Sequence, residues 1–413
     1  MVLKSHASLR PHKNNAPIQQ FFSKKLFLIL LYLFNINIAF GQELITITPE
    51  NFLNQNPSPE RKAIVDFITH QFDGKSVTQK DLDQLWNDDD AQKTQQLSRF
   101  QIIDQQVYAD SYKKDHHLFL ILKKYFEELV KQYKINNVDF IVYVSDLIPA
   151  INNDKVITIP AFVMYKNLDS IYEQNKLLLP DAFFVTDNWK KLIHKIEQAS
   201  DQYPWKIKEN KIFWRGSSTG CAKNDPYNMR SYNIKNFDQL PRLSLVMLSK
   251  LYPDLIDAKL AYYQQFSKDK DGDNLKKILN MLFGKGPKNA NEEEHLKYKY
   301  LISVDGNAAT GTRVPWIMLS NSVLMKQNSN NIEWFYSALK PYTNYIPINE
   351  RLTNLFEQIE WMKNHDQELQ QISFNAHNFV KNNLMPEAID AHMVIILNEY
   401  SKIQLETPKR TFQ

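Results

Sequence analysis

Two short segments of the chain combine glycine with arginine and with hydroxyl side chains. The first is residues 214–220 (WRGSSTG), and the second is residues 305–313 (DGNAATGTR). Glycine is scarce, with 9 residues in a chain of 413, so two glycines in each segment are informative. A backbone that can approach a ligand closely, hydroxyl donors and a planar guanidinium together suit a pyrophosphate group. The alternative is that both segments are turns that carry a structural arginine.

Both segments follow short apolar runs that are typical of buried strands. Beyond residue 138 such runs alternate with amphipathic stretches, which indicates βαβ units and a parallel sheet. Ligands of such sheets lie at the carboxyl ends of the strands, where these two segments begin. The predicted strands are Phe140–Val144, Val156–Ile159, Lys211–Trp214, Tyr300–Val304, Ser322–Met325 and Tyr345–Ile348. The predicted helices are Pro59–Phe72, Leu118–Tyr133, a stretch containing Leu352 to Met362, and Ala388–Ser401.

One carboxylate is placed where a general base would be useful. Asp146 comes just after the predicted strand Phe140–Val144. A carboxylate at a strand end that faces a cleft suits removal of a proton from an acceptor hydroxyl. The alternative is that Asp146 begins a turn or caps a helix.

Charge and cysteine content exclude several classes of function. The protein has 50 basic and 46 acidic residues, but residues 1–41 hold five of the basic ones and none of the acidic ones. The remainder is therefore close to neutral, which excludes a global basic surface for nucleic acid. The single cysteine, Cys221, excludes an intrachain disulfide and a cysteine-rich zinc site. Neither a Walker motif nor a Rossmann fingerprint is present, so ATPase and NAD-enzyme interpretations lack their motif.

A cluster of three aspartates offers a different chemistry. Asp269, Asp271 and Asp273 could bind a divalent ion and, through it, a nucleotide diphosphate. Lys268, Lys270 and Lys276 surround them, so a solvated loop is the alternative.

The N-terminus has the layout of a secretory signal. A basic stretch (residues 1–25) precedes an apolar run (26–40) and a small-residue site around residues 39–41. The apolar run is shorter than the roughly 20 residues that usually span a membrane, which favours cleavage over anchoring.

Several separated blocks, in the same order, resemble glycosyltransferase family 90. This family includes animal protein O-glucosyltransferases, fungal capsule-associated xylosyltransferases and bacterial lipopolysaccharide-modifying enzymes. The similarity covers about residues 138–403. The blocks are residues 214–217 with Gly220, 242–246 running to 254–258, 298–301 leading to Asp305, Gly306 and Arg313, and 334–335 through 339–342 to 345–347.

The resemblance implies an α/β fold that is GT-B-like, with two Rossmann-like lobes, a donor cleft between them and a helical N-terminal extension. It also implies inversion at the anomeric carbon without a required metal or other cofactor, and we expect a UDP-sugar as the donor. The expected regions are a signal peptide or membrane anchor (1–41), a helical N-terminal region (42–137), the remainder of an N-terminal acceptor lobe (138–205), a C-terminal nucleotide-sugar-binding lobe (206–385) and a C-terminal helix that packs back on the N-terminal lobe (386–413).

Individual positions match the family residue by residue. Ser217 and Arg242 match contacts to the donor, and residues 308–313 match the nucleotide-binding loop, with Arg313 as the main diphosphate contact. The loop from Asn307 to Arg313 is about one residue longer than in the animal members. The donor-binding residues implied are Arg215, Gly216, Ser217, Arg242, Asp305, Gly306, Ala308, Ala309, Thr310, Gly311, Thr312 and Arg313.

Two aspartates match the acceptor side of the family. Asp146 matches the catalytic aspartate of the animal enzymes. Asp181, in a Pro-Asp-x-x-Phe element, resembles a residue of plant and bacterial members, with helix capping as the alternative.

The function expected from the resemblance is transfer of a glucose- or xylose-like sugar to a hydroxyl of a glycan, lipopolysaccharide or protein. The alternatives are a non-catalytic glycan-binding relative and a metal-dependent transferase that uses Asp269, Asp271 and Asp273. We expect no nucleic-acid partner and membrane association, if any, through residues 26–40. The expected location is the secretory pathway or cell envelope, with the cytosolic face of a membrane as the alternative.

Overall fold

The computed structural model describes residues 43–89, 96–144, 158–168, 174–220, 233, 240–284 and 290–412. The chain divides into a unit of residues 1–43 and a compact unit of residues 44–413, and every helix and strand of the described residues belongs to the second unit. The apolar stretch 26–40, Asp146 and Cys221 lie outside the described residues. Within the described ranges, no helix is both long and apolar enough to cross a membrane.

Three helices open the described part of the chain, and each begins at a hydroxyl residue that caps it. The side-chain oxygens of Thr48, Ser58 and Thr78 each accept a hydrogen bond from the backbone N–H three residues on. Proline starts the first two helices, where no backbone N–H is needed. These signals define α2 (Pro49–Gln55), α3 (Pro59–His70) and α4 (Gln79–Trp86), and the longer α6 (His117–Gln132) follows β1 and β2.

The first five-stranded sheet mixes antiparallel and parallel strands. Its order is β2-β1-β3-β4-β6, in which β1 is antiparallel to β2 and β3, and β3, β4 and β6 are parallel. The strands are β1 (Leu97–Ile103), β2 (Gln106–Ser111), β3 (Val138–Tyr143), β4 (Ala161–Val163) and β6 (Lys176–Leu178).

The structure corrects two of the sequence expectations here. Residues 42–137 are not helical throughout, because β1 and β2 form an antiparallel pair within them. The strand predicted at residues 156–159 is displaced along the chain. Thr158 and Ile159 precede β4, and residues 156 and 157 lie outside the described residues.

Polar residues buried in β1 explain why this strand was not predicted. Ser98, Arg99 and Gln101 are at most 1% exposed. Arg99 forms a bidentate ion pair with Asp139 of β3, 2.9 Å from Nε to Oδ1 and 2.7 Å from Nη2 to Oδ2. Gln101 Nε2 donates to the same carboxylate over 2.7 Å. Because these partners satisfy one another, polar side chains occupy a fully buried strand whose sequence lacks an apolar pattern.

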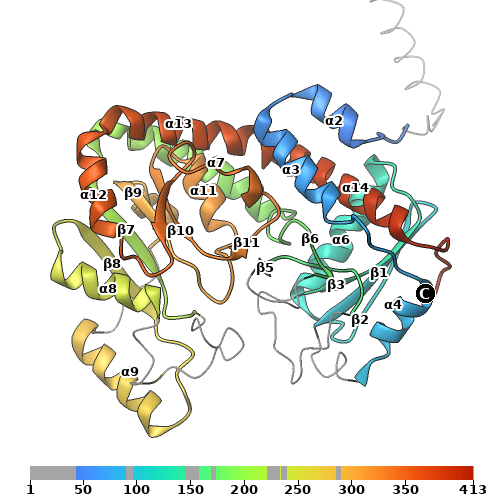
Figure 1. Cartoon of the computed structure of the whole chain (residues 1–413), viewed down its shortest axis with the longest axis horizontal. Helices are drawn as coiled ribbons and strands as arrows, with labels where there is room; N and C mark the ends of the chain where they lie inside the picture. The colour runs from blue at the N-terminus through green and yellow to red at the C-terminus, as the bar shows by residue number, and fades with distance from the viewer. Residues whose placement is uncertain are drawn as a thin grey trace, which may run out of the picture. The chain divides into compact units, whose positions relative to one another are not determined.

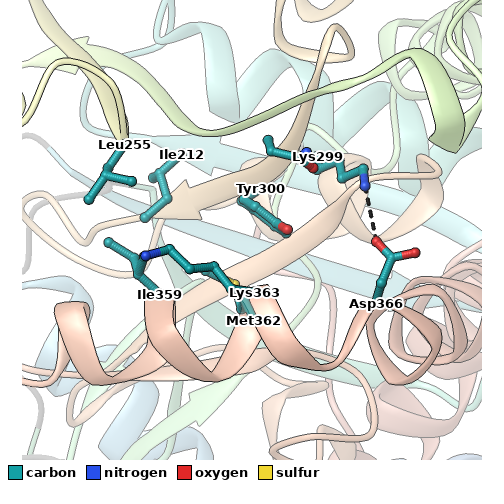
Figure 2. Close-up of a pocket in the computed structure, with 9 residues that line it drawn as sticks. Ile212, Leu255, Lys299, Tyr300, Ile359, Met362, Lys363 and Asp366 are labelled. Atoms are coloured by element: carbon teal, nitrogen blue, oxygen red, sulfur yellow. Dashed lines mark hydrogen bonds and ion pairs between the residues drawn. The ribbon is translucent and has the colours of Figure 1, made fainter.

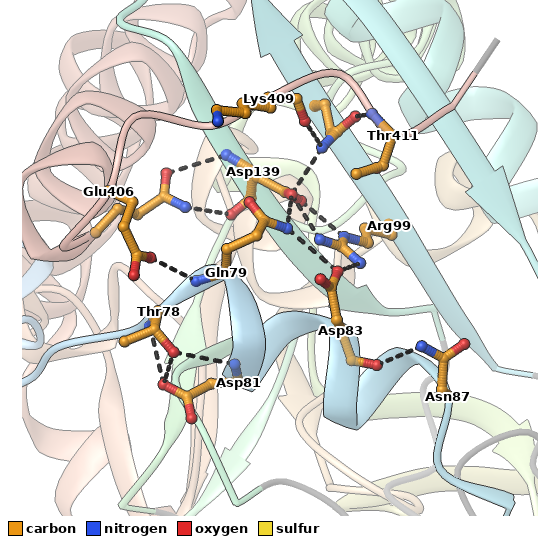
Figure 3. Close-up of polar contacts among 12 residues, drawn as sticks. Thr78, Gln79, Asp81, Asp83, Asn87, Arg99, Asp139, Glu406, Lys409 and Thr411 are labelled. Carbon is orange, nitrogen blue, oxygen red and sulfur yellow. Dashed lines mark hydrogen bonds and ion pairs between the residues drawn. The ribbon is translucent and has the colours of Figure 1, made fainter.

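The C-terminal segment, residues 404–412, lies along this polar network (Figure 3). The Lys409 carbonyl accepts from Gln101 Nε2 at 3.0 Å, and the Thr411 N–H donates to Gln101 Oε1 at 2.8 Å. The segment follows α14 (Pro386–Ile403), which packs against α3 and β3. The end of the chain therefore covers the first sheet.

The second five-stranded sheet is entirely parallel. Its order is β12-β10-β9-β7-β8. The chain passes from β7 to its neighbour β8 and then returns to β9 on the other side of β7. Such a reversal is a topological switch point, where open α/β sheets bind ligands beyond the carboxyl ends of their strands. The strands are β7 (Glu209–Ser217), β8 (Ile256–Tyr262), β9 (Tyr298–Ser303), β10 (Val323–Asn328) and β12 (Ile346–Asn349).

Helices cover both faces of the second sheet (Figure 1). Apolar side chains of α8 (Pro241–Leu251), α9 (Lys270–Phe283) and α12 (Leu355–Asn364) form one core. Those of α7 (Asp187–Gln202), α11 (Arg313–Leu319) and the second half of α13 (Asp366–Asn383) belong to another core, which continues into the first sheet. The short elements are η2 (Trp205–Ile207), α10 (Glu292–His295) and η4 (Tyr336–Ala338).

A short antiparallel pair of strands connects the segment that follows β4 of the first sheet with the segment that follows β10 of the second sheet. It joins β5 (Lys166–Asn167) to β11 (Asn331–Ile332), which lie between the two sheets in Figure 1. Asn167 Nδ2 donates to Asn331 Oδ1 at 2.8 Å, and the Leu168 N–H donates to the Asn330 carbonyl at 2.8 Å.

The buried Arg99–Asp139 pair predicts a large stability loss on substitution. Asp139→Asn leaves the Arg99 guanidinium buried without its bidentate acceptor, so we expect a loss of about 3–5 kcal/mol in unfolding free energy. Urea unfolding followed by circular dichroism measures it. The matched control is Asp66→Asn, which breaks an exposed ion pair to Lys62 and should cost about 0.5 kcal/mol. Equal losses in the two variants would contradict the prediction.

Candidate functional site

The two glycine-bearing segments lie side by side at the switch point of the second sheet. We call residues 216–220 the β7 loop and residues 304–313 the β9 loop, because they stand at the carboxyl ends of these neighbouring strands. From the β7 loop the chain continues to α8, and from the β9 loop it continues directly into α11. These helices contribute to different cores on opposite faces of the sheet. The carboxyl edge of the sheet, with its two loops, therefore lies between the two helices.

Arg242 of α8 bridges the two loops. Its Nη1 donates to the Ser217 carbonyl at 3.2 Å and to Thr219 Oγ1 at 2.7 Å. Its Nε and Nη2 donate to the Val304 carbonyl at 3.2 and 3.0 Å. One guanidinium therefore spans the ends of β7 and β9 and fixes the spacing of the loops. These acceptors are neutral carbonyl and hydroxyl groups, and the charge of Arg242 also acts on the buried Asp305 carboxylate.

A buried tryptophan lies beneath Arg242 and Arg313. Trp214 is 0% exposed, and the guanidinium carbons of Arg242 and Arg313 lie 5.7 and 5.9 Å from its ring centroid. Cation–π attraction to an indole favours such positions. The two arginines, 71 positions apart in the sequence, therefore converge on one aromatic surface.

Arg313, the first residue of α11, keeps an unbalanced positive charge. Its Nη2 donates to the Arg215 carbonyl at 2.9 Å. Among the described residues, no carboxylate lies within ion-pair distance of this guanidinium. Burial lowers the pKa of Arg313 to about 10, against the opposing charge of Glu292, so the group is cationic at neutral pH. A bound anion would stabilise this charge.

Two glycines of the loops are required by close neighbours. A Cβ added to Gly216 would lie 2.5 Å from the Trp214 ring, and one added to Gly306 would lie 2.7 Å from Arg242 Nη2. Both distances are shorter than side chains tolerate. The glycines therefore allow the backbone to approach the tryptophan and the bridging arginine.

The side chains of two predicted donor-binding residues make polar contacts within the protein. The Arg215 guanidinium pairs with the Asp257 carboxylate at 2.9 Å, and it stacks 4.1 Å from the Phe213 ring. The Asp305 carboxylate accepts from Ser329 Oγ and from Asn331 Nδ2. The side chains of these two predicted residues thus position strand and loop, while the Arg215 carbonyl orients Arg313.

The remaining residues of the β9 loop have different surroundings. Ala308 and Ala309 are buried in the core. Thr310 Oγ1 bonds with Ser303 Oγ at 2.7 Å, and Thr312 precedes the first turn of α11. In the β7 loop, Ser217 Oγ bonds with Thr219 Oγ1 at 2.8 Å.

The two predicted aspartates differ in what the structure describes. Asp181 lies near Gly311 of the β9 loop, since a Cβ added to Gly311 would be 3.7 Å from Oδ2 of Asp181. The base predicted at Asp146 lies outside the described residues.

Sequence reasoning missed Gln265, which connects the two loops. Its Nε2 donates to Asn307 Oδ1 at 2.8 Å, and its Oε1 accepts from the Gly220 N–H at 3.1 Å. The residue has a left-handed φ of +65°, which a non-glycine residue adopts rarely. No local sequence signal marks this glutamine, because its partners are 42 and 45 positions away.

The predicted metal-binding alternative has a structural explanation for its first residue. Asp269 caps α9, and its Oδ1 accepts from the Gly272 N–H at 2.8 Å and from Ser267 Oγ at 2.7 Å. In the part of the chain that the structure describes, no group of three or more histidine, cysteine or acidic side chains is arranged to hold a metal.

A cavity of about 190 Å³ lies at the opposite end of the second sheet (Figure 2). Asn210 and Lys299, near the amino ends of β7 and β9, line it together with residues of α12. Lys299 Nζ pairs with Asp366 at 3.0 Å beside it. The cavity is therefore separate from the loops at the carboxyl ends.

Comparisons with known proteins agree on one family. The model described as Glycosyl transferase family 90 matches residues 72–412. Protein O-glucosyltransferase 2 of Danio rerio is 24% identical over 323 residues, which cover 77% of this chain and 58% of the relative. Protein O-glucosyltransferase 3 of Homo sapiens is 32% identical over 168 residues, which cover 41% and 31%. Protein O-glucosyltransferase 1 of Homo sapiens is 29% identical over 215 residues, which cover 52% and 47%.

The matched region spans less than two thirds of the length of these relatives. A solved glycosyltransferase from Rickettsia africae matches 67% of this chain and 74% of its own, with 13% identity and a TM-score of 0.34.

Gly306 provides a test of the bridging arginine. In Gly306→Ala the new Cβ would displace Arg242 and disturb the spacing of the loops. Because a hydrogen bond to a charged group contributes about 1.5–3 kcal/mol, we expect UDP binding to weaken by about tenfold or more in isothermal calorimetry. Gly74→Ala is the control for a general loss of stability, since its φ of +67° strains an alanine although no atom lies within 4 Å of the added Cβ, and it should leave UDP affinity unchanged. Unchanged UDP affinity in Gly306→Ala would contradict the assignment.

Proposed function

The chain belongs to glycosyl transferase family 90, and on this premise we propose that it is an inverting glycosyltransferase. It moves a sugar from a nucleoside diphosphate sugar, with UDP as the expected nucleotide, to an acceptor hydroxyl. The observation that carries this proposal is the convergence of Arg242 and Arg313 over Trp214, beyond the carboxyl ends of β7 and β9. Two fixed cations at a topological switch point suit a diphosphate.

In this proposal the arginines assist departure of the leaving group. Negative charge grows on the diphosphate as its bond to the anomeric carbon breaks. Arg313 and Arg242, with the Ser217 hydroxyl and loop N–H groups, would stabilise that charge without a metal. The hydrogen bonds of Arg242 to the two strand ends hold its guanidinium in place before the ligand arrives. Preorganised charges of this kind lower the barrier because they need little rearrangement during the reaction.

The base in this proposal is Asp146. It takes the proton from the acceptor hydroxyl, and the oxygen attacks the anomeric carbon from the face opposite the diphosphate. The new bond to oxygen forms as the bond to the diphosphate breaks, so the configuration inverts. The carboxylate of Asp146 suits this role by its chemistry and by its position just after β3 in the sequence.

We propose a GT-B-like arrangement for these parts. The second sheet, within residues 206–385, is the donor lobe. The first sheet, with residues 138–205, the helix α14 and the C-terminal segment that follows it, forms the acceptor lobe. The position of Asp181, whose Oδ2 would lie 3.7 Å from a Cβ added to Gly311, supports this arrangement.

We also propose an acceptor and a cellular location for the enzyme, on the basis of the relatives. Relatives named protein O-glucosyltransferases favour a glucose-like donor and a protein hydroxyl as acceptor, with a xylose-like donor and a glycan or lipopolysaccharide acceptor as the alternatives. A secretory or envelope location, reached through a signal or anchor in residues 1–41, fits a protein acceptor. A glycan-binding relative without activity is the second candidate function, and it predicts glycan binding without donor turnover.

Removal of the unbalanced cation tests the function. We expect Arg313→Ala to lower UDP release from UDP-glucose or UDP-xylose by about 10²–10³-fold, because one stabilising contact to the leaving group is lost. The control Arg410→Ala removes an arginine that lies over Tyr108 of β2 and should leave turnover unchanged. Retained turnover in Arg313→Ala would reject the site. Loss of wild-type turnover in EDTA would instead favour the aspartate cluster at residues 269–273.

Asp146→Asn separates chemistry from donor binding. The variant lacks a base but keeps both arginines, so we expect UDP affinity within about twofold of wild type and transfer reduced by about 10²-fold or more. Calorimetry and product analysis measure the two quantities. Transfer at the wild-type rate would mean that another residue accepts the proton.

A further inference from the structure

The β9 loop meets residues of the first sheet at one glycine. Gly311 has a left-handed φ of +57°, and a Cβ added there would lie 2.9 Å from the hydroxyl oxygen of Tyr165 and 3.7 Å from Oδ2 of Asp181. Tyr165 follows β4, and Asp181 follows β6, its parallel neighbour. Side chains from beyond the carboxyl ends of the first sheet therefore fill the space into which a side chain at position 311 would point.

Tyr165 and Asp181 form a fixed pair. The Tyr165 hydroxyl donates to Oδ2 of Asp181, and Oδ1 accepts from the Phe183 N–H at 2.7 Å. Tyr165 is 6% exposed. Burial, together with the charge of Asp181, raises the pKa of Tyr165 well above its usual value, so the hydroxyl remains a donor at neutral pH. Both carboxylate oxygens of Asp181 are thus engaged within the protein.

The residue before Gly311 is held from the opposite flank. Thr310 Oγ1 bonds with Ser303 Oγ at 2.7 Å, and the Thr310 side chain also bonds with the Tyr336 hydroxyl. Tyr336 in turn donates to Glu333 Oε1 at 3.0 Å. Residues from β9 and η4 therefore fix one side of the loop, and Tyr165 contacts the other.

We infer that Tyr165 and Asp181 are a positioning pair, which limits the space available to the backbone at Gly311 and so sets where the Arg313 guanidinium meets the donor diphosphate. The inference rests on the proposed function. The Arg313 N–H donates to the Thr310 carbonyl at 3.3 Å, so a single turn connects residue 311 to the arginine. A shift at Gly311 is passed on to Arg313 within that turn. The donor site is consequently completed by residues of both sheets.

A double-mutant cycle tests this contact. We expect Tyr165→Phe to raise the UDP dissociation constant and the donor KM by about tenfold, because the hydrogen bond to a charged partner is lost. Gly311→Ala should weaken UDP binding more, through its collision with Tyr165 and its positive φ. In the Tyr165→Phe background the collision is relieved while the backbone strain remains. The added cost of Gly311→Ala should therefore be several-fold smaller there.

A readout without nucleotide separates this inference from the proposed function. We expect Tyr165→Phe to speed hydrogen exchange of the Arg313 amide about tenfold, whereas the control Tyr108→Phe, which removes a hydroxyl bonded to Gln106, should not. If the wild-type protein bound no UDP, the proposed function would be refuted. The hydrogen exchange of the Arg313 amide would still show whether Tyr165 positions the loop. Unchanged exchange at Arg313, or an equal cost of Gly311→Ala in both backgrounds, would overturn the inference.

Discussion

The carboxyl edge of the second sheet depends on one guanidinium that joins two strands. Arg242 binds the Ser217 and Val304 carbonyls, which are the groups that β7 and β9 leave unpaired where they end. Because the arginine reaches both, the spacing of the two loops is set by the covalent geometry of one side chain. A glycine at position 306 leaves room for this guanidinium, since an added Cβ would lie 2.7 Å from Arg242 Nη2 and would displace it. The small residue at position 306 is therefore explained by the bridge that Arg242 forms.

The β9 loop is also where the two sheets depend on each other. The β5–β11 pair ties Asn167 to Asn331, and Asn331 in turn bonds to the Asp305 carboxylate at the base of the loop. The segment after β4 thus reaches the beginning of the loop indirectly, through Asn167 and Asn331, and Tyr165 and Asp181 lie near its end, at Gly311. Without that part of the chain, Asn331 would keep its bond to Asp305 but lose Asn167, and no side chain of the first sheet would lie beside Gly311.

Much of the second sheet could be predicted from sequence, because β7, β9, β10 and β12 are apolar runs followed by turn residues. Strand β8 alternates the buried Ile256, Ala258 and Leu260 with half-buried or exposed positions, which is the period-two pattern of a strand with one buried face. Strand β1 could not be read in this way, since its buried Arg99 is compatible with the core only through Asp139, 40 positions away. The same limit applies to the site. Glycines and arginines stand out locally, whereas Gln265 and Tyr165 acquire their roles from contacts made after folding.

The contrast between Arg215 and Arg313 shows why a shared motif does not imply a shared role. Arg215 is paired with the Asp257 carboxylate, so its positive charge is neutralised within the sheet. Arg313 rests on a carbonyl and an indole, neither of which carries a negative charge. Burying a cation costs stability, and among the described residues no carboxylate lies within ion-pair distance to offset that cost. An anionic ligand would offset it, because its binding would supply the missing charge. The unbalanced arginine, rather than the glycines around it, is therefore the feature of this edge that points most directly to a diphosphate.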